Sequence, residues 1–190
     1  MSDPTPTPIT KKLKRSGYLL YINANFNTTD TDDSHADWLL IGKDVEDLSV
    51  ELNPDVETKK NILDELSVND NGYEPSISVD TYYADPAGDA TTTKGKFYSK
   101  MKDIAMNRKT GDDCRTLVME VFIDKTDTPS FEAWREEVIV KPQSYGGPQG
   151  GISIPYNIHF DGNRVSGTAT FTGLSDPDKA KSTPVTFATT

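Results

Sequence analysis

The sequence predicts a mainly β fold: a β-sandwich or barrel with one flanking α-helix, a long hairpin extension and terminal arms. Apolar side chains repeatedly alternate with polar ones, which places them on one face of a strand. Only one segment has the apolar spacing of an amphipathic helix. The 190 residues suit one domain, yet only 34% are hydrophobic and the mean hydropathy is −0.59, which indicates that part of the chain lies in exposed arms and loops.

Strand patterns recur along most of the chain. In chain order they cover residues 17–23, 48–52, 73–83, 115–123, 133–141 and 152–172. The last is the clearest, because apolar residues alternate from Ile152 to Phe160 and again from Val165 to Phe171. Residues 161–163, with the sequence Asp-Gly-Asn, favour a tight turn, so residues 152–172 are predicted to form a β-hairpin.

The helix is predicted around residues 96–110. Phe97, Met101 and Ile104 recur at helical spacing, lysines occupy the other sides of the cylinder, and Gly111 is placed to end the helix. We expect its apolar face to cover one open end of the β domain.

These patterns divide the chain into a domain with two arms. Residues 1–16 form an N-terminal arm, residues 17–173 the β domain and residues 174–190 a C-terminal arm. The domain contains a polar loop at 24–37 and an extension at about 44–70.

Within the extension, residues 48–61 are predicted to form a hairpin that turns at Asn53, Pro54 and Asp55. Its apolar side chains, with that of Ile62 directly after it, would find too little core in their own subunit, so they are expected to pack against another copy. The predicted subunit-contact residues are Leu48, Val50, Leu52, Asn53, Pro54, Asp55 and Val56.

The net charge of −10 is unevenly distributed. Residues 1–29 carry +3, residues 30–89 carry −14 and residues 90–190 carry +1. Recognition of DNA through its phosphates requires a basic face. The charge pattern therefore argues against specific DNA binding and is compatible with polar self-assembly or with repelling DNA.

No group of residues indicates catalysis, a metal or a cofactor. Asp30, Asp32 and Ser34 resemble the start of a calcium-binding loop, but His35 stands where that loop needs glycine. Cys114, the single cysteine, heads an apolar strand and is predicted to be a buried small residue. We expect a protein that is not an enzyme and uses no cofactor.

No apolar run approaches the roughly 20 residues of a membrane helix, and the N-terminal residues lack the apolar core of a secretory signal. The chain is therefore expected to have no membrane anchor and to be made in a cytoplasm.

Several blocks resemble the tail-tube proteins, or major tail proteins, of long-tailed phages of Gram-positive hosts. The order and spacing of the blocks carry the resemblance, which spans about residues 17–172. The blocks are residues 41–59, 72–80 with Tyr82 and Tyr83, 107–113, 144–147, and 157–164 with Gly167.

The resemblance implies a structural virion protein of the tail tube. Such subunits assemble as six-fold rings that stack head to tail, and their loops and arms reach neighbouring subunits. The implied partners are further copies of the chain, a tape measure inside the tube, and terminator and baseplate proteins at its ends. DNA would pass through the lumen without specific binding.

A lumen that conducts DNA is expected to present acidic and hydroxyl side chains, because basic ones would hold the phosphates. Glu120, Glu132, Glu136 and Glu137 lie on or beside two predicted strands and are the lumen-facing candidates. Neighbouring residues such as Glu136 and Glu137 point to opposite faces of a strand, so only some of the four can share one face. The acids of residues 30–89 have a competing use, since they could meet the lysine-bearing helix or the basic residues 11–15 of the next ring.

The alternative function is a carbohydrate-binding or other non-catalytic β-sandwich module. Such a module would share the fold and usually presents tryptophans on one flat face. Trp38 and Trp134 are the only tryptophans in the chain.

Overall fold

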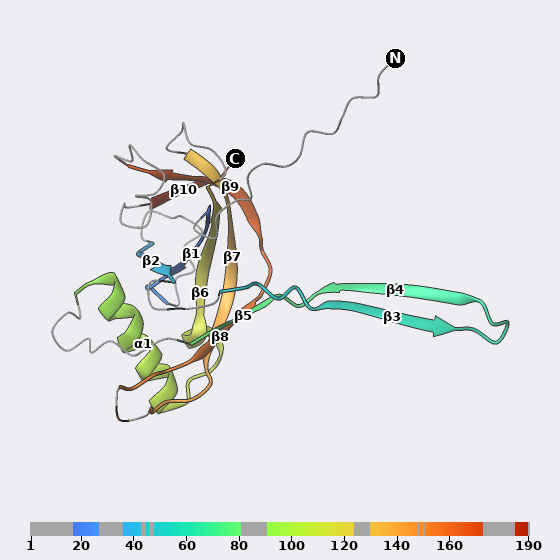
Figure 1. The fold of residues 1–190 in the computed structure, drawn as a ribbon, viewed down its shortest axis with the longest axis horizontal. Coiled ribbons are helices and arrows are strands. Elements are labelled where there is room, and N and C mark those ends of the chain that lie inside the picture. Colours follow the sequence, from blue (N-terminus) through green and yellow to red (C-terminus); the bar gives the residue numbers. More distant parts are fainter. Residues whose placement is uncertain are drawn as a thin grey trace, which may run out of the picture.

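The computed structural model describes residues 17–26, 36–42, 45, 48–80, 91–123, 130–147, 149, 151–172 and 185–189. These residues form one curled eight-stranded sheet, a separate two-stranded ribbon that projects from it, and one α-helix (Figure 1). The predicted mainly β class with one flanking helix is confirmed. No helix among them is long and apolar enough to cross a membrane.

The sheet is antiparallel, and its main path runs in the order β10-β9-β7-β6-β1-β2. A branch at β7 adds β8 and then β5. The bounds are β1 (Tyr18–Asn23), β2 (Trp38–Ile41), β5 (Ser76–Val79), β6 (Arg115–Phe122), β7 (Ser130–Pro142), β8 (Tyr156–Phe160), β9 (Val165–Phe171) and β10 (Val185–Thr189).

The hairpin predicted at residues 152–172 is wrong. β8 and β9 do not pair with each other: both pair with β7, β8 along residues 138–142 and β9 along residues 130–135. Together they form one bent strand beside β7, and residues 161–164 are a bulge that stays bonded to it through Asp161 N to Glu137 O at 2.9 Å. Gly162 and Asn163 have positive φ angles (90° and 56°), which occur both in bulges and in hairpin turns. The local sequence therefore could not distinguish a bulge from a turn.

Two hydrophobic cores lie on opposite faces of the sheet. The first contains Leu20, Ile22, Val118, Val138 and Ile158, and the second contains Tyr21, Met119, Phe131, Ala169 and Phe171. Alternate residues of the same strand enter different cores, so β6 is buried continuously from Thr116 to Val121. This arrangement explains why the apolar alternation moves from even positions in β8 to odd positions in β9.

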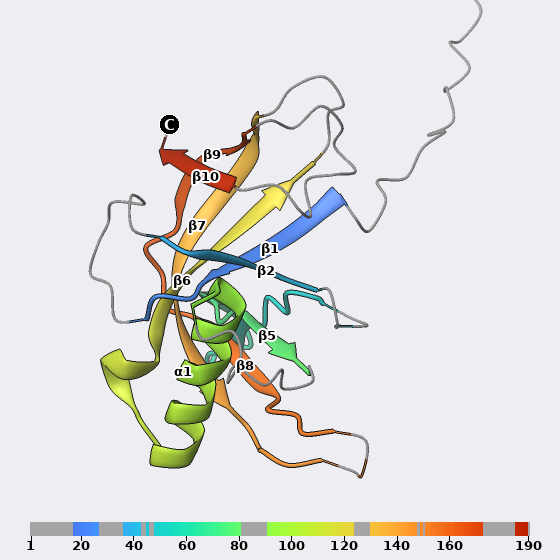
Figure 2. The same ribbon diagram turned by 90° about the vertical axis from the view of Figure 1, so that its left-hand side faces the viewer.

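The helix α1 (Thr93–Asn107) packs Phe97, Tyr98 and Met101 into the first core, in front of the sheet in Figure 2. The Thr92 hydroxyl caps it by accepting from Gly95 N at 3.2 Å. The predicted end at Gly111 is wrong. Arg108 ends the helix in the left-handed conformation (φ 50°), and Gly111 begins a short 3₁₀ helix, Gly111–Cys114.

Asp37, the residue directly before β2, connects that strand to the start of the helix. Its carboxylate accepts hydrogen bonds from the Thr93 hydroxyl and from Lys96 Nζ at 2.7 Å. Burial opposes ionisation of Asp37, but these two hydrogen bonds outweigh it and hold the pKa of Asp37 below its ordinary value.

The C-terminal segment differs from the predicted arm, because residues 185–189 form β10 against β9. Phe187 is buried in the second core and leaves no room for a side chain at Gly167, where a Cβ would lie 2.3 Å from Ala188 O. Cys114 is fully buried, as predicted.

Several sequence expectations lie outside the described residues. They concern the arms at residues 1–16 and 174–184, most of the loop at 24–37 with its calcium-like Asp30, Asp32 and Ser34, and Tyr82 and Tyr83.

We expect Phe97→Ala to destabilise the folded monomer by roughly 3–5 kcal/mol, the usual cost of emptying a buried aromatic site. Phe97 is 1% exposed, and its ring centroid lies 5.6 Å from that of Tyr156 and 5.7 Å from that of Tyr98. Chemical denaturation of the monomer measures the effect. Met106→Ala, on the same helix but 47% exposed, is the matched control and is expected to change stability by less than about 0.5 kcal/mol. An unchanged Phe97→Ala monomer would show that the helix does not cover its own core.

Candidate functional site

The most exposed part of the described chain is a two-stranded antiparallel ribbon, β3 (Pro54–Lys60) and β4 (Leu66–Tyr73). It projects from the sheet, on the side away from α1 (Figure 1). Every residue of β3 is exposed, and so is every residue of β4 except Gly72. An isolated two-stranded ribbon is marginally stable in water, so this length of uncovered hairpin needs a partner surface.

The ribbon overlaps the extension predicted at about residues 44–70 and runs on to Tyr73, but the predicted turn at Asn53, Pro54 and Asp55 is wrong. At Asn53 the chain leaves the domain: Glu51 and Ser76 exchange two backbone hydrogen bonds of 2.9 Å, and Glu74 N donates to Asn53 O at 3.2 Å. Asn53 has a left-handed backbone (φ 43°), which directs the chain into the ribbon without reversing the direction of the chain.

The reversal occurs at residues 61–65 and is organised by Asn61. Its side-chain Oδ1 accepts from Leu63 N at 2.9 Å and from Glu65 N at 3.0 Å, while its Nδ2 donates to Glu65 Oε2 at 2.7 Å. Asparagine commonly stabilises turns in this way. Asn61 was the signal in the sequence that could have located the turn.

The register makes the ribbon amphipathic. Val56 lies opposite Asp70, Thr58 opposite Val68 and Lys60 opposite Leu66. These pairs share one face, whereas Glu57, Lys59, Ser67 and Asn69 share the other. The turn adds Ile62, fully exposed, and Leu63, 73% exposed. One face of the ribbon therefore carries three apolar side chains among Thr58, Lys60 and Asp70, and the turn adds two more; the described part of the chain leaves all five exposed.

The predicted subunit-contact residues separate into three groups. Leu48 is buried in the first core and Val50 packs against that core, so both serve their own subunit. Asn53, Pro54 and Asp55 lie exposed at the base of the ribbon. Leu52 and Val56 are 56% and 54% exposed and remain available to a neighbour.

The sequence prediction included Ile62 but missed other exposed apolar side chains of the ribbon. Among them are Leu63, Leu66 and Val68, each more than 60% exposed. Placing the turn too early left the second strand of the ribbon out of the candidate set.

The four predicted lumen acids do not share one face. Glu120, Glu132 and Glu136 lie on the same face of β6 and β7, as the register from Val118↔Glu136 to Phe122↔Glu132 requires. Glu137 lies on the opposite face, where its carboxylate pairs with Arg115 at 3.3 Å. The expectation that neighbouring Glu136 and Glu137 point apart is confirmed.

Glu120 and Glu136 form an internal charge cluster with Arg164. The same Nη1 atom of Arg164 lies 2.6 Å from Glu120 and 2.9 Å from Glu136, and the Tyr18 hydroxyl donates to Glu120 at 2.7 Å. Both carboxylates are 8% exposed. Burial disfavours the charged guanidinium, but the two carboxylates outweigh it and raise the pKa of Arg164. These two acids therefore stabilise the fold around the bulge of residues 161–164.

Glu132 is the exposed member on this face, and it has hydroxyl residues on its β9 side and Phe122 as its partner on β6. Its cross-strand partner on β9 is Thr168, and the next pair along is Ser130↔Thr170, whose hydroxyls lie 3.2 Å apart. This polar face of β7 and β9 lies on the opposite side of the sheet from the second core.

The two tryptophans do not form a common platform. Trp134 lies on the same face as Glu132 and is stacked by Arg164, whose guanidinium is 5.6 Å from the ring centroid. Trp38 packs against the second core, on the other face. Among the described residues, no group of His, Cys, Asp and Glu side chains is arranged to hold a metal ion.

Comparison with solved structures finds tail components. The chain is similar to the tail of an empty GTA particle (TM-score 0.49, 10% identity, covering 80% of this chain and 97% of that one). It is also similar to the AFP tube-terminating cap (TM-score 0.46, 9% identity, 85% and 95% covered) and to the sheath/tube terminator of PVC, an extracellular contractile injection system, in the extended state (TM-score 0.43, 8% identity, 87% and 99% covered).

No family model matches the chain, and no curated protein matches it. The narrower resemblance, to tail-tube proteins of phages of Gram-positive hosts, remains a prediction.

We expect Arg164→Met to destabilise the monomer by roughly 1–3 kcal/mol, because two buried carboxylates lose their shared cation while the arginine itself was 44% exposed. Thermal melting measures the loss. Replacing both acids in that background, as Glu120→Gln and Glu136→Gln, is expected to recover much of it. A triple variant no more stable than Arg164→Met would refute a shared charge cluster.

Proposed function

We propose that this chain is a structural subunit of a phage-type tail tube, which polymerises as stacked six-fold rings into a hollow tube that conducts DNA. The observation that carries the proposal is the projecting ribbon, with exposed apolar side chains along one face and at its tip. A monomer gains nothing from such a feature, whereas a repeating assembly buries it against the next copy.

The projecting geometry favours contact between copies over closure within one chain. The ribbon leaves the domain at Glu51 and Ser76 and points away from both cores. If the ribbon of one copy contacts a different surface on the next copy, the association is head-to-tail. Repetition of such a contact gives rings or filaments. Tape-measure, terminator and baseplate proteins would be the further partners, and the assembled location would be the virion.

The polar face around Glu132 is proposed to line the lumen. A conducting surface has to avoid phosphate contacts, and Ser130, Glu132, Thr168 and Thr170 offer hydroxyls and one carboxylate without a cation. Glu120 and Glu136 lie on the same face but are buried and share Arg164, and Glu137 is on the other face. Glu132 is therefore the lumen candidate that is exposed and has no ion pair among the described residues.

We propose that the chain is not an enzyme, because its sequence contains no catalytic motif and a structural role requires none. The two tryptophans on opposite faces disfavour the carbohydrate-binding alternative, which needs them side by side.

We expect a shortened ribbon to leave a folded monomer that does not form tubes. Residues 58–68 are replaced by Asn-Gly, which joins Glu57 to Asn69 by a two-residue hairpin turn. Because the removed residues lie outside both cores, the melting temperature of the domain is expected to change little. Electron microscopy measures assembly, and tubes of normal length from this variant would contradict a role for the ribbon.

We expect Glu132→Lys tubes to assemble but to slow DNA ejection from reconstituted virions, most strongly at low salt. Each subunit would then add a phosphate contact, and such contacts weaken as salt rises. Asp112→Lys makes the same charge change outside this face, at a side chain that is 81% exposed, and is the control. Unimpaired ejection through tubes shown to carry Lys at position 132 would remove Glu132 from the lumen.

A further inference from the structure

The ribbon and the helix α1 carry opposite charges. Residues 51–74 contain seven acidic and two basic residues, a net charge of −5. Residues 93–109, which cover the helix, contain six basic residues and one acidic residue, a net charge of +5. Surfaces of opposite sign attract and orient each other during association.

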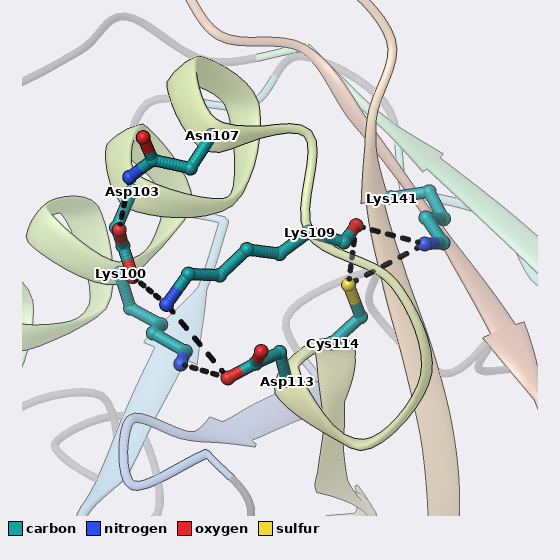
Figure 3. Close-up of polar contacts among 7 residues, drawn as sticks. All are labelled: Lys100, Asp103, Asn107, Lys109, Asp113, Cys114 and Lys141. Atoms are coloured by element: carbon teal, nitrogen blue, oxygen red, sulfur yellow. Dashed lines mark hydrogen bonds and ion pairs between the residues drawn. The ribbon is translucent and has the colours of Figure 1, made fainter.

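Half of the helix cations already hold acids of their own chain. Lys96 pairs with Asp37 at 2.7 Å, and Lys109 pairs with Asp103 at 2.8 Å. Lys100 and Lys109 both approach Asp113, at 3.4 and 3.8 Å (Figure 3). The two contacts with Asp113 fasten α1 to the following 3₁₀ helix. All of these ion pairs leave the three lysines less available to a partner.

Lys102 and Arg108 differ from them, since neither has an acidic partner within 4 Å among the described residues. Both are exposed. Lys102 and Met106 lie one turn apart on the helix surface, Met106 is 47% exposed, and Arg108 follows at the C-terminal cap. The C-terminal half of α1 therefore presents an exposed apolar side chain between two cations.

The tip of the ribbon has the complementary pattern. Ile62 and Leu63 are followed directly by Asp64 and Glu65, and all four are exposed. Asp64 has no ion pair among the described residues, and Glu65 is bonded only by the neutral amide of Asn61. The two apolar side chains can contact Met106, and the two carboxylates that follow them can face Lys102 and Arg108.

The two patterns cannot meet within one molecule. The ribbon projects on one side of the sheet and α1 packs on the other (Figure 1), and Figure 2, which views the molecule from the α1 side, shows the helix in front. A contact between them must join two copies, and since its two surfaces differ it can repeat from copy to copy.

We propose that the ribbon tip of one copy, Ile62 to Glu65, docks on the C-terminal half of α1 of a neighbouring copy, at Lys102, Met106 and Arg108. This contact rests on the proposed function and names the surface that receives the ribbon. The apolar groups of the tip pack on Met106, and the carboxylates of Asp64 and Glu65 face the two cations. Assembly through this contact weakens as salt rises, because the charges lie at an exposed rim.

Charge exchange between two variants tests the contact. The first variant, Lys102→Glu with Arg108→Glu, has two acids at the proposed docking site on the helix and keeps the acidic tip. The second, Asp64→Asn with Glu65→Lys, has a basic tip and a basic helix; asparagine is chosen because residue 64 has φ 60°, which asparagine tolerates. Each variant alone is expected to raise the concentration needed for assembly about tenfold or more at ~0.05 M salt. Their equimolar mixture is expected to assemble like the original chain, because every tip then finds a helix of opposite sign.

A cross-link locates the contact directly. Leu63→Cys and Met106→Cys are placed in one chain and treated with a short thiol-reactive cross-linker, while Cys114 is fully buried. A ladder of covalent oligomers is expected from assembled tubes. Each single-cysteine variant, and the pair Leu63→Cys with Tyr145→Cys, serve as controls and are expected to give no ladder.

The outcomes distinguish this contact from the proposed function. Tubes that form normally from both charge variants, with no Leu63–Met106 ladder, overturn the contact and leave the tube assignment standing. A ladder through Tyr145 in place of Met106 also overturns it. A wild-type chain that stays monomeric at every concentration and salt overturns the tube assignment together with the contact.

Discussion

The described structure depends on β7, which pairs along both of its edges and carries side chains into both cores. β6 occupies one edge, and β8 and β9 together occupy the other as a single bent strand. Val138 and Val140 enter the first core, and Phe131 and Ala133 enter the second. Because the side chains of a strand alternate, a register shift of one residue would exchange the two sets and expose both.

The bulge at residues 161–164 follows from that constraint. The bent strand has to present even-numbered apolar residues to the first core and odd-numbered ones to the second, and the bulge separates the two stretches while keeping both on β7. Arg164, at the end of the bulge, pairs with both Glu120 and Glu136 on the neighbouring strands. The same feature therefore shapes the sheet and supplies the cation that two buried carboxylates share.

The ribbon is stabilised differently from the domain. Among the described residues its two strands pair only with each other and its apolar side chains have no core beneath them, and Asn61 organises its turn locally. Its charge is opposite to that of α1, on the far side of the sheet. The ribbon and the C-terminal half of α1 are thus two exposed surfaces of opposite charge, as the proposed contact between copies requires.

Residue patterns alone determined the fold class, the helix face of Phe97, Met101 and Ile104, the buried Cys114, and the presence of an extension near residues 44–70. These depend on local periodicity and composition, which a single sequence displays. Tertiary structure decided which strand Tyr156–Phe160 pairs with, that Leu48 belongs to the core, that Glu120 and Glu136 share a cation, and that the ribbon turns at Asn61 and not at Asn53. The reason is physical: Asp-Gly-Asn and Asn-Pro-Asp permit several backbone paths at similar free energy, and only pairing with distant strands selects one of them.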